Sequence, residues 1–243
     1  MVGESVAKRK PRVTPTKGTK LMLRIGHRGA AGYAPENTLS AIKKAVTLKV
    51  DFVELDVRAT NDRQLVIFHD RRVDRLTIGK GAVADLSLAD LRRLTLPGGH
   101  AIPTLEEGLK AAEGKVGVML ELKIHGLVEP ALETLERSGF SGPVIVASFF
   151  HDELLHLRRL QPKAQTLALL VGRPITPAGF ALEAEATHVG IAFDTLGQAY
   201  VDALNSAGLQ IFAFTVNDPA DIQRVAALGV DGIISDFPDR IQK

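Results

Sequence analysis

Short apolar runs alternate with segments of helical periodicity along most of the chain. Leu39, Ile42 and Val46 show the helical spacing, and either Asn37 or Thr38 is suited to cap the helix that they predict. Apolar runs of strand length lie at residues 21–26, 52–57, 116–122, 144–147, 166–171, 188–193, 210–216 and 231–235. Helices are predicted at 105–112, 127–137, 151–160, 177–184 and 198–207, and another begins at Pro219 after an Asp218 cap.

Eight strands alternating with helices indicate an α/β protein. The run from Ile211 to Val216 is apolar at both odd and even positions, as expected for a strand of a parallel sheet that is covered on both faces. Alternation over this length favours a TIM (β/α)8 barrel. A doubly wound open sheet is the main alternative, because local patterns do not show whether a sheet closes.

Residues 70–103 interrupt the alternation. They are rich in Arg, Asp and Gly, and only Ala89 to Leu94 has the pattern of a short helix. We interpret this segment as a small insertion after the second strand, of the kind that forms a lid or a substrate loop. A short apolar run at 64–68 precedes it, and Asn61-Asp62-Arg63 predicts a turn before that run. We therefore expect one barrel domain at 21–243.

The amino-acid composition excludes some classes of function. The 243 residues include no cysteine, which excludes disulfides, thiolate metal sites and a cysteine nucleophile. A net charge of +2 is too small to indicate a nucleic-acid partner. Residues 1–20 are basic and lack an apolar run, so we expect a disordered tail rather than a secretory signal. No apolar stretch is long enough for membrane insertion. These features predict a cytoplasmic protein, either a monomer or a homodimer.

Charged and titratable side chains stand at the ends of the predicted strands. His27 follows the first strand, and Glu121 and Lys123 end the third. Glu54 and Asp56 are two residues apart on the second strand, so both side chains point to the same side. His69 follows the run at 64–68. Because the carboxyl ends of barrel strands meet at one rim, these groups are expected to lie close together.

Three carboxylates at one rim suit a hard divalent cation. Glu54, Asp56 and Glu121 offer the oxygen ligands that Mg²⁺ or Ca²⁺ prefers, and a cation would relieve their mutual repulsion. The alternative is ion pairing with Arg28, Arg58 or Lys123. Glu54 and Asp56 alone would favour ion pairing, but the convergence of three carboxylates favours a metal.

The remaining candidates suit phosphodiester cleavage. That reaction requires one oxygen to be activated and another to be protonated, and two imidazoles can perform both roles at neutral pH. His27 and His69 are the candidate pair. Arg28 and Lys123 are suited to bind the single negative charge of a phosphodiester.

The ordered motifs resemble the glycerophosphodiester phosphodiesterase family. They are His27-Arg28-Gly29, Pro35-Glu36-Asn37-Thr38, Glu54-Leu55-Asp56-Val57, His69-Asp70 with Asp74-Arg75, Ile102-Pro103-Thr104-Leu105 and Glu121-Leu122-Lys123. Weaker matches follow at Ser148-Phe149, Thr215-Val216-Asn217 and residues 231–236, so the resemblance spans roughly residues 22–239.

The resemblance implies a TIM barrel that hydrolyses glycerophosphodiesters to sn-glycerol 3-phosphate and an alcohol. It implies acid-base catalysis by the two histidines, a divalent metal on the three carboxylates, and phosphate binding by Arg28 and Lys123. Glu36 matches a further polar position near the site. Phe214 stands where members of the family often have Trp, which keeps a stacking surface and loses the indole N–H. Both are expected to contribute to substrate binding.

Three other functions compete with this hypothesis. A related enzyme could act on lysophospholipids or phosphatidylinositol, although no apolar docking segment supports it. A barrel that only binds phosphodiesters would not need an acid-base pair. A sugar-phosphate isomerase or aldolase on the same fold would not need three carboxylates.

Overall fold

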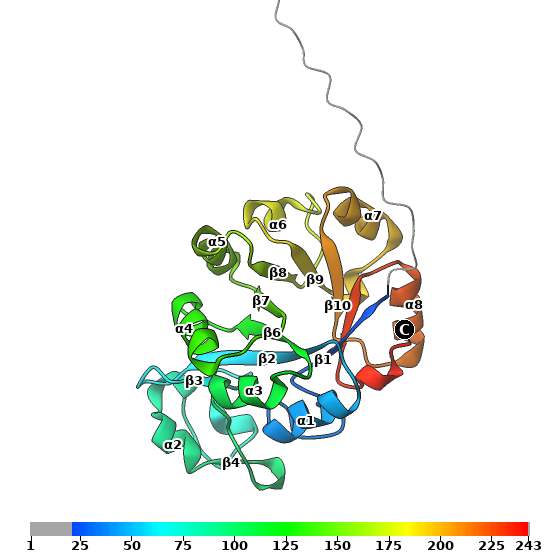
Figure 1. Ribbon diagram of the computed structural model, residues 1–243. Coiled ribbons are helices and arrows are strands. Elements are labelled where there is room, and N and C mark those ends of the chain that lie inside the picture. The colour runs from blue at the N-terminus through cyan, green and yellow to red at the C-terminus, as the bar shows by residue number, and fades with distance from the viewer. Residues whose placement is uncertain (1–20, 243) are drawn as a thin grey trace, which may run out of the picture.

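The computed structural model describes residues 21–242, and eight of its strands form a closed parallel barrel (Figure 1). The strands are β1 (Leu23–Gly26), β2 (Phe52–Ala59), β6 (Gly117–Leu122), β7 (Val144–Ser148), β8 (Gln165–Leu170), β9 (His188–Ala192), β10 (Gln210–Phe214) and β11 (Gly232–Ser235). β1 pairs with both β11 and β2, which closes the ring. The TIM barrel prediction is confirmed, and the open sheet was wrong. The tail predicted at residues 1–20 lies outside the described residues.

Helices surround the ring (Figure 1). They are α1 (Leu39–Thr47), α3 (Leu105–Ala112), α4 (Val128–Ser138), α5 (His151–Leu160), α6 (Gly179–Glu183), α7 (Gln198–Ser206) and α8 (Pro219–Ala227), and the short η5 (Pro238–Arg240) follows β11. Of the two proposed caps for α1, Thr38 is the one used, because its side chain accepts a hydrogen bond from Ala41 N. Asp218 caps α8 as predicted. α6 is shorter than the 177–184 expected.

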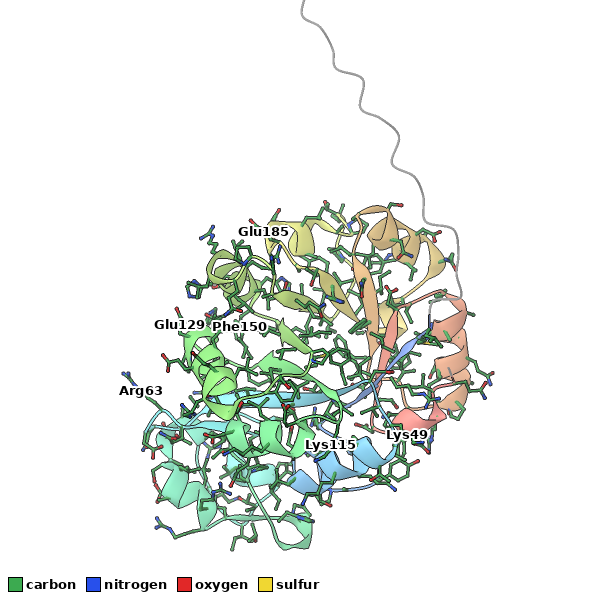
Figure 2. All side chains as sticks on the ribbon, in the orientation of Figure 1. Lys49, Arg63, Lys115, Glu129, Phe150 and Glu185 are labelled. Atoms are coloured by element: carbon green, nitrogen blue, oxygen red, sulfur yellow. The ribbon has the colours of Figure 1, made fainter. Side chains whose placement is uncertain are left out.

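Alternation along β2 separates two apolar layers. Val53, Leu55 and Val57 belong to the core between the strands and the surrounding helices. Phe52 points the other way, into a second cluster inside the ring that also contains Ile25, Met119, Ile145, Ala147, Leu167, Leu169, Phe212 and Ile234. Figure 2 shows side chains throughout this interior. Glu54 and Asp56 point to the same side of β2 as Phe52 and lie nearer its carboxyl end. Their side chains therefore lie at the mouth of the barrel, above the apolar cluster.

A hairpin returns the chain to the mouth after β2. β3 (Leu65–Ile67) pairs antiparallel with β2, and Val57 is the partner of Ile67. The predicted turn at 61–63 connects them, and Arg63 projects away from the body of the protein (Figure 2). Phe68 N donates a hydrogen bond to Asp56 O. The reversal of the chain therefore places His69 near Asp56 of β2, at the mouth of the barrel.

Residues 70–103 form a packed segment on the β3 side of the ring (Figure 1). It contains η1 (Val73–Arg75), η2 (Val83–Asp85), α2 (Leu88–Arg92), β4 (Thr95–Leu96), η3 (Pro97–Gly99) and β5 (His100–Ala101). Its own apolar cluster consists of Val66, Phe68, Val73, Val83, Leu91, Leu96 and Ile102. The helix expected at 89–94 is α2, whose Ser87 and Asp90 form a capping box. η1 is therefore anchored by this apolar cluster, although it lies in an insertion.

Candidate active site

Three carboxylates meet at the mouth of the barrel. β2 and β6 are adjacent, and their register places Asp56 beside Glu121. Glu54 lies one inward position below Asp56 on β2. One carboxylate oxygen from each of the three residues lies within 4.8 Å of the other two. The predicted convergence of Glu54, Asp56 and Glu121 is therefore present in the structure.

Two cations lie against these carboxylates. Lys123 Nζ lies 3.3 Å from Asp56 Oδ1 and 2.5 Å from Glu121 Oε1. Arg28 Nε lies 3.4 Å from Asp56 Oδ2. Arg58, the third candidate for ion pairing, instead donates from Nε to His69 O. The expected ion pairs and the expected metal site thus involve the same groups. Within residues 21–242, one of the three carboxylates makes no ion pair within 4.0 Å, although the charges of Arg28 and Lys123 still act on it.

Glu54 is that carboxylate. Only 3% of the residue is exposed. Its Oε2 accepts a hydrogen bond from Arg28 N, but its Oε1 has no hydrogen-bond partner in the part of the chain that the structure describes. Burial and the charges of Asp56 and Glu121 raise the pKa of Glu54 well above its ordinary value. A buried acceptor without a donor is costly, so Oε1 is suited to a cation.

The other two carboxylates have opposite pKa shifts. Burial raises the pKa of Glu121, and the charge of Asp56 adds to this effect. Burial would also raise the pKa of Asp56, but Lys123, Arg28 and His69 together lower it. Asp56 is therefore the carboxylate most firmly held in its ionised form.

His27 is oriented by a carboxylate from the last strand. It follows β1, and its Nδ1 lies 2.7 Å from Asp236 Oδ1. Asn217 Nδ2 donates to the other oxygen, Asp236 Oδ2, at 2.6 Å, and Asn217 Oδ1 accepts from Asp236 N. Arg28 Nε lies 3.3 Å from His27 Nε2. These contacts fix the ring plane and place Nε2 against Arg28, the candidate phosphate-binding side chain.

His69 has a similar partner within the insertion. Its Nδ1 lies 2.7 Å from Asp70 Oδ1. Arg75 Nε donates to Asp70 Oδ2 at 2.6 Å and, with the bond from His69, lowers the pKa of Asp70 to about 2. Burial lowers the pKa of His69, opposed by the charge of Asp56 and the bond to Asp70. The charge of His69 lowers the pKa of Asp56, and the charge of His27 lowers the pKa of Glu121.

The loop after β1 holds Arg28 in an uncommon conformation. Arg28 has a φ of 49°, and Gly29 follows with a φ of 91°. A Cβ on Gly29 would lie 2.5 Å from the backbone carbon of Ala41, so a side chain does not fit there. Arg28 Nη1 donates to Glu36 Oε1 at 2.7 Å. The loop thus directs the backbone N–H of Arg28 at Glu54 and its guanidinium at Asp56 and Glu36.

Aromatic side chains border the carboxylates on the opposite side of the mouth. Phe149 and Phe214 pack edge to face with their ring centroids 6.1 Å apart. Both line a small cavity together with His27, Glu54, Met119, Glu121, Ala147, Leu169, Thr215 and Ile234. The predicted Phe214 therefore lies in the same cavity as one histidine and two carboxylates.

Several residues hold the candidate catalytic side chains in place, and the strand pattern did not predict their roles. Asn37, which belongs to a quoted motif and was expected as a possible helix cap, donates from Nδ2 to Asp56 Oδ2 at 2.7 Å. Asp236 and Asn217 belong to the weaker motif matches, but nothing in their spacing links them to His27. Asp70 and Arg75 also lie in quoted motifs, and only the folded chain shows that they support His69.

Comparisons with known proteins show which family the sequence resembles over most of its length. The pattern of the glycerophosphoryl diester phosphodiesterase family matches residues 27–240. YhdW of Bacillus subtilis is 40% identical over 233 residues, covering 90% of this chain and 96% of that protein. A glycerophosphodiester phosphodiesterase of Caldanaerobacter subterraneus is 32% identical over 230 residues, covering 89% of this chain and 95% of that protein.

A solved structure shows the same likeness. It is an Oleispira antarctica phosphodiesterase in complex with the product sn-glycerol-3-phosphate. The two chains superpose with a TM-score of 0.85 at 29% identity, covering 90% of this chain and 94% of that chain. Among residues 21–242, no helix combines the length and apolar character needed to cross a bilayer.

Proposed function

Because the chain belongs to the glycerophosphoryl diester phosphodiesterase family and is a phosphoric diester hydrolase, we propose that it cleaves glycerophosphodiesters by metal-dependent, two-histidine catalysis. The products are sn-glycerol 3-phosphate and an alcohol. One observation carries the proposal: Glu54 Oε1, which has no hydrogen-bond partner among residues 21–242, lies in a group of three carboxylates at a mouth that also holds two His–Asp pairs.

The donor set fits a hard divalent cation. All three candidate ligands are carboxylates, and two of their buried oxygens, Glu54 Oε1 and Asp56 Oδ1, lack hydrogen bonds within the described residues. Glu54, Asp56 and Glu121 would hold Mg²⁺ or Ca²⁺. Such a cation supplies charge that polarises a phosphoryl oxygen.

Arg28 and Lys123 bind and orient the phosphodiester. Both are already held at the carboxylates, Lys123 by Asp56 and Glu121 and Arg28 by Asp56 and Glu36. A bound phosphate adds negative charge beside them, and a guanidinium offers two parallel N–H donors to it. Glu36 acts through Arg28, because its carboxylate already accepts from that side chain. Phe214 packs against the apolar part of the substrate.

The two histidines move the protons. One takes a proton from the nucleophile as the new phosphorus–oxygen bond forms, and the other gives a proton to the departing alkoxide as its bond to phosphorus breaks. Asp236 and Asp70 keep Nδ1 of each ring engaged, so Nε2 serves the substrate. The nucleophile is either water or the neighbouring glycerol hydroxyl. Only the hydroxyl gives a cyclic phosphate, which ³¹P NMR of the reaction distinguishes.

The test is release of glycerol 3-phosphate from glycerophosphocholine by the purified protein. It is measured with EDTA and after addition of Mg²⁺ or Ca²⁺. Metal-dependent release supports the proposal, and equal release in EDTA would refute the metal role. A parallel assay with lysophosphatidylcholine micelles distinguishes the lysolipid alternative, since that enzyme would prefer the lipid substrate. Tight substrate binding without release would instead indicate a binding protein.

A further inference from the structure

Arg75 joins two loops of the mouth through one guanidinium group. It lies in η1 of the insertion, and its Nε and Nη2 donate to Asp70 Oδ2 and Oδ1 at 2.6 and 3.1 Å. Its Nη1 and Nη2 donate to Glu36 Oε2 and Oε1 at 3.1 and 2.7 Å. Asp70 follows β3, whereas Glu36 belongs to the loop between β1 and α1. The same side chain therefore bonds to one segment that follows a barrel strand, β1, and to another that follows the hairpin strand β3.

Each carboxylate that Arg75 holds in turn contacts a candidate functional group. Asp70 Oδ1 lies 2.7 Å from His69 Nδ1. Glu36 Oε1 accepts from Arg28 Nη1 at 2.7 Å. A continuous chain of hydrogen bonds consequently runs from His69 through Arg75 to Arg28. The histidine proposed to move a proton and the arginine proposed to bind phosphate are held by the same residue.

The geometry requires an arginine at this position. Asp70 and Glu36 are both within hydrogen-bond distance of one guanidinium, so without its charge two carboxylates would face one another. The two carboxylates raise the pKa of Arg75, and both carboxylates have lowered pKa values in return. A lysine carries the charge but has no planar fork to bond two carboxylates at once. Since the Arg75 side chain is 48% exposed, it contributes little to the core of the insertion.

We propose that Arg75 is a positioning residue through which the insertion aligns His69 with Arg28 for phosphodiester cleavage. Arg75 does not touch the reacting atoms in this assignment. The inference rests on the proposed roles of His69 and Arg28. It assigns to the insertion a function in the catalytic step, in addition to shaping the substrate opening.

The experiment compares Arg75→Gln and Arg75→Lys with Arg72→Gln. Arg72 is the matched control, because it lies beside the same turn, its side chain is 56% exposed and it forms an ion pair with Asp74. The expected result for Arg75→Gln is a fall in kcat of roughly 10- to 100-fold, as for other residues that orient catalytic ligands. Arg75→Lys should retain part of the rate. Arg72→Gln should match the wild type. Arg75→Gln loses the ion pairs with Asp70 and Glu36, so kcat is compared well below the melting temperature of every variant.

Chemical rescue separates positioning from a purely structural role. Arg75→Ala leaves room for a guanidinium ion, so low concentrations of guanidinium chloride should raise its kcat several-fold and leave Arg72→Gln unchanged. Guanidinium also weakens folding, so rescue cannot come from general stabilisation. KM should change less than kcat, because Lys123 still binds the phosphate in the ground state.

The outcomes distinguish this inference from the proposed function. No turnover by the wild type with any metal would refute the proposed function itself. Wild-type turnover that persists in His69→Ala would refute the role of that histidine and, with it, the inference. If both of those tests succeed but Arg75→Gln keeps the wild-type kcat, or Arg72→Gln loses as much, only the inference fails. Absence of rescue in a folded Arg75→Ala protein that has lost activity would also overturn it.

Discussion

Replacing Glu54 with Gln should weaken metal binding without lowering the stability of the metal-free barrel. The raised pKa of Glu54 means that the folded protein binds a proton there more tightly than the unfolded chain does. Its contribution to stability is thus present below the unfolded pKa and is lost as the pH rises through the folded pKa. Above that range the ionised group destabilises the metal-free fold. Glutamine removes the charge and keeps an oxygen that can accept from Arg28 N.

The size of the effect follows from the spacing of the carboxylates. Two full charges no more than 4.8 Å apart repel by about 3.5 kcal/mol or more at an effective dielectric constant near 20. Lys123 and Arg28 offset part of this repulsion. Metal-free Glu54→Gln should therefore be as stable as the wild type at pH 8, or more stable. In the wild type, a cation at about 100 times its Kd should add about 2.7 kcal/mol, which raises Tm by roughly 5–10 °C for a protein of this size.

The assay is thermal unfolding at pH 8 with EDTA and with Mg²⁺ or Ca²⁺. Glu113→Gln is the control, because Glu113 bonds Ser141 at the amino-terminal end of the barrel, away from the mouth. This control should show the full metal-dependent rise in Tm, and Glu54→Gln should show little of it. The reasoning is refuted if metal-free Glu54→Gln unfolds well below the wild type, or if metal stabilises both variants equally.

Three further predictions test the surroundings of the histidines. His27→Ala and His69→Ala should each lower kcat by roughly 10²- to 10⁴-fold with little change in Tm, and near-normal turnover in either would remove that histidine from the mechanism. Asp236→Asn should lower kcat and leave the metal-dependent rise in Tm intact, because its partner is His27; a loss of metal binding would place Asp236 among the ligands. The lowered pKa of Asp70, about 2, stabilises the fold above its unfolded pKa and this stability is lost as the pH falls through the folded value. The difference in unfolding free energy between wild type and Asp70→Asn, measured by urea unfolding, should therefore shrink from pH 5 towards pH 3, and a constant difference would contradict the pKa assignment.

Local sequence patterns were enough to predict the strands, most helices and the candidate catalytic and metal-binding residues. The eight barrel strands and most helices lie where apolar periodicity predicted them, since that periodicity reflects which side of each element is buried. The Glu54 and Asp56 spacing placed both carboxylates on one side of a strand. The register between β2 and β6 then brought Glu121 beside Asp56, which a parallel barrel makes plausible but a sequence cannot specify.

Closure of the barrel and the partners of each side chain were decided only by tertiary structure. The pairing of β1 with β11 brings Asp236 to His27 across 209 residues, and no local signal contains that contact. Asn37 has the composition of a helix cap, yet the fold directs its side chain to Asp56. The hairpin at β3 and the helical turn η1 place Arg75 within hydrogen-bond distance of Asp70 and Glu36. Residue type and spacing set what a side chain can do, whereas long-range packing sets which charged groups it faces, and those neighbours determine its pKa and its orientation.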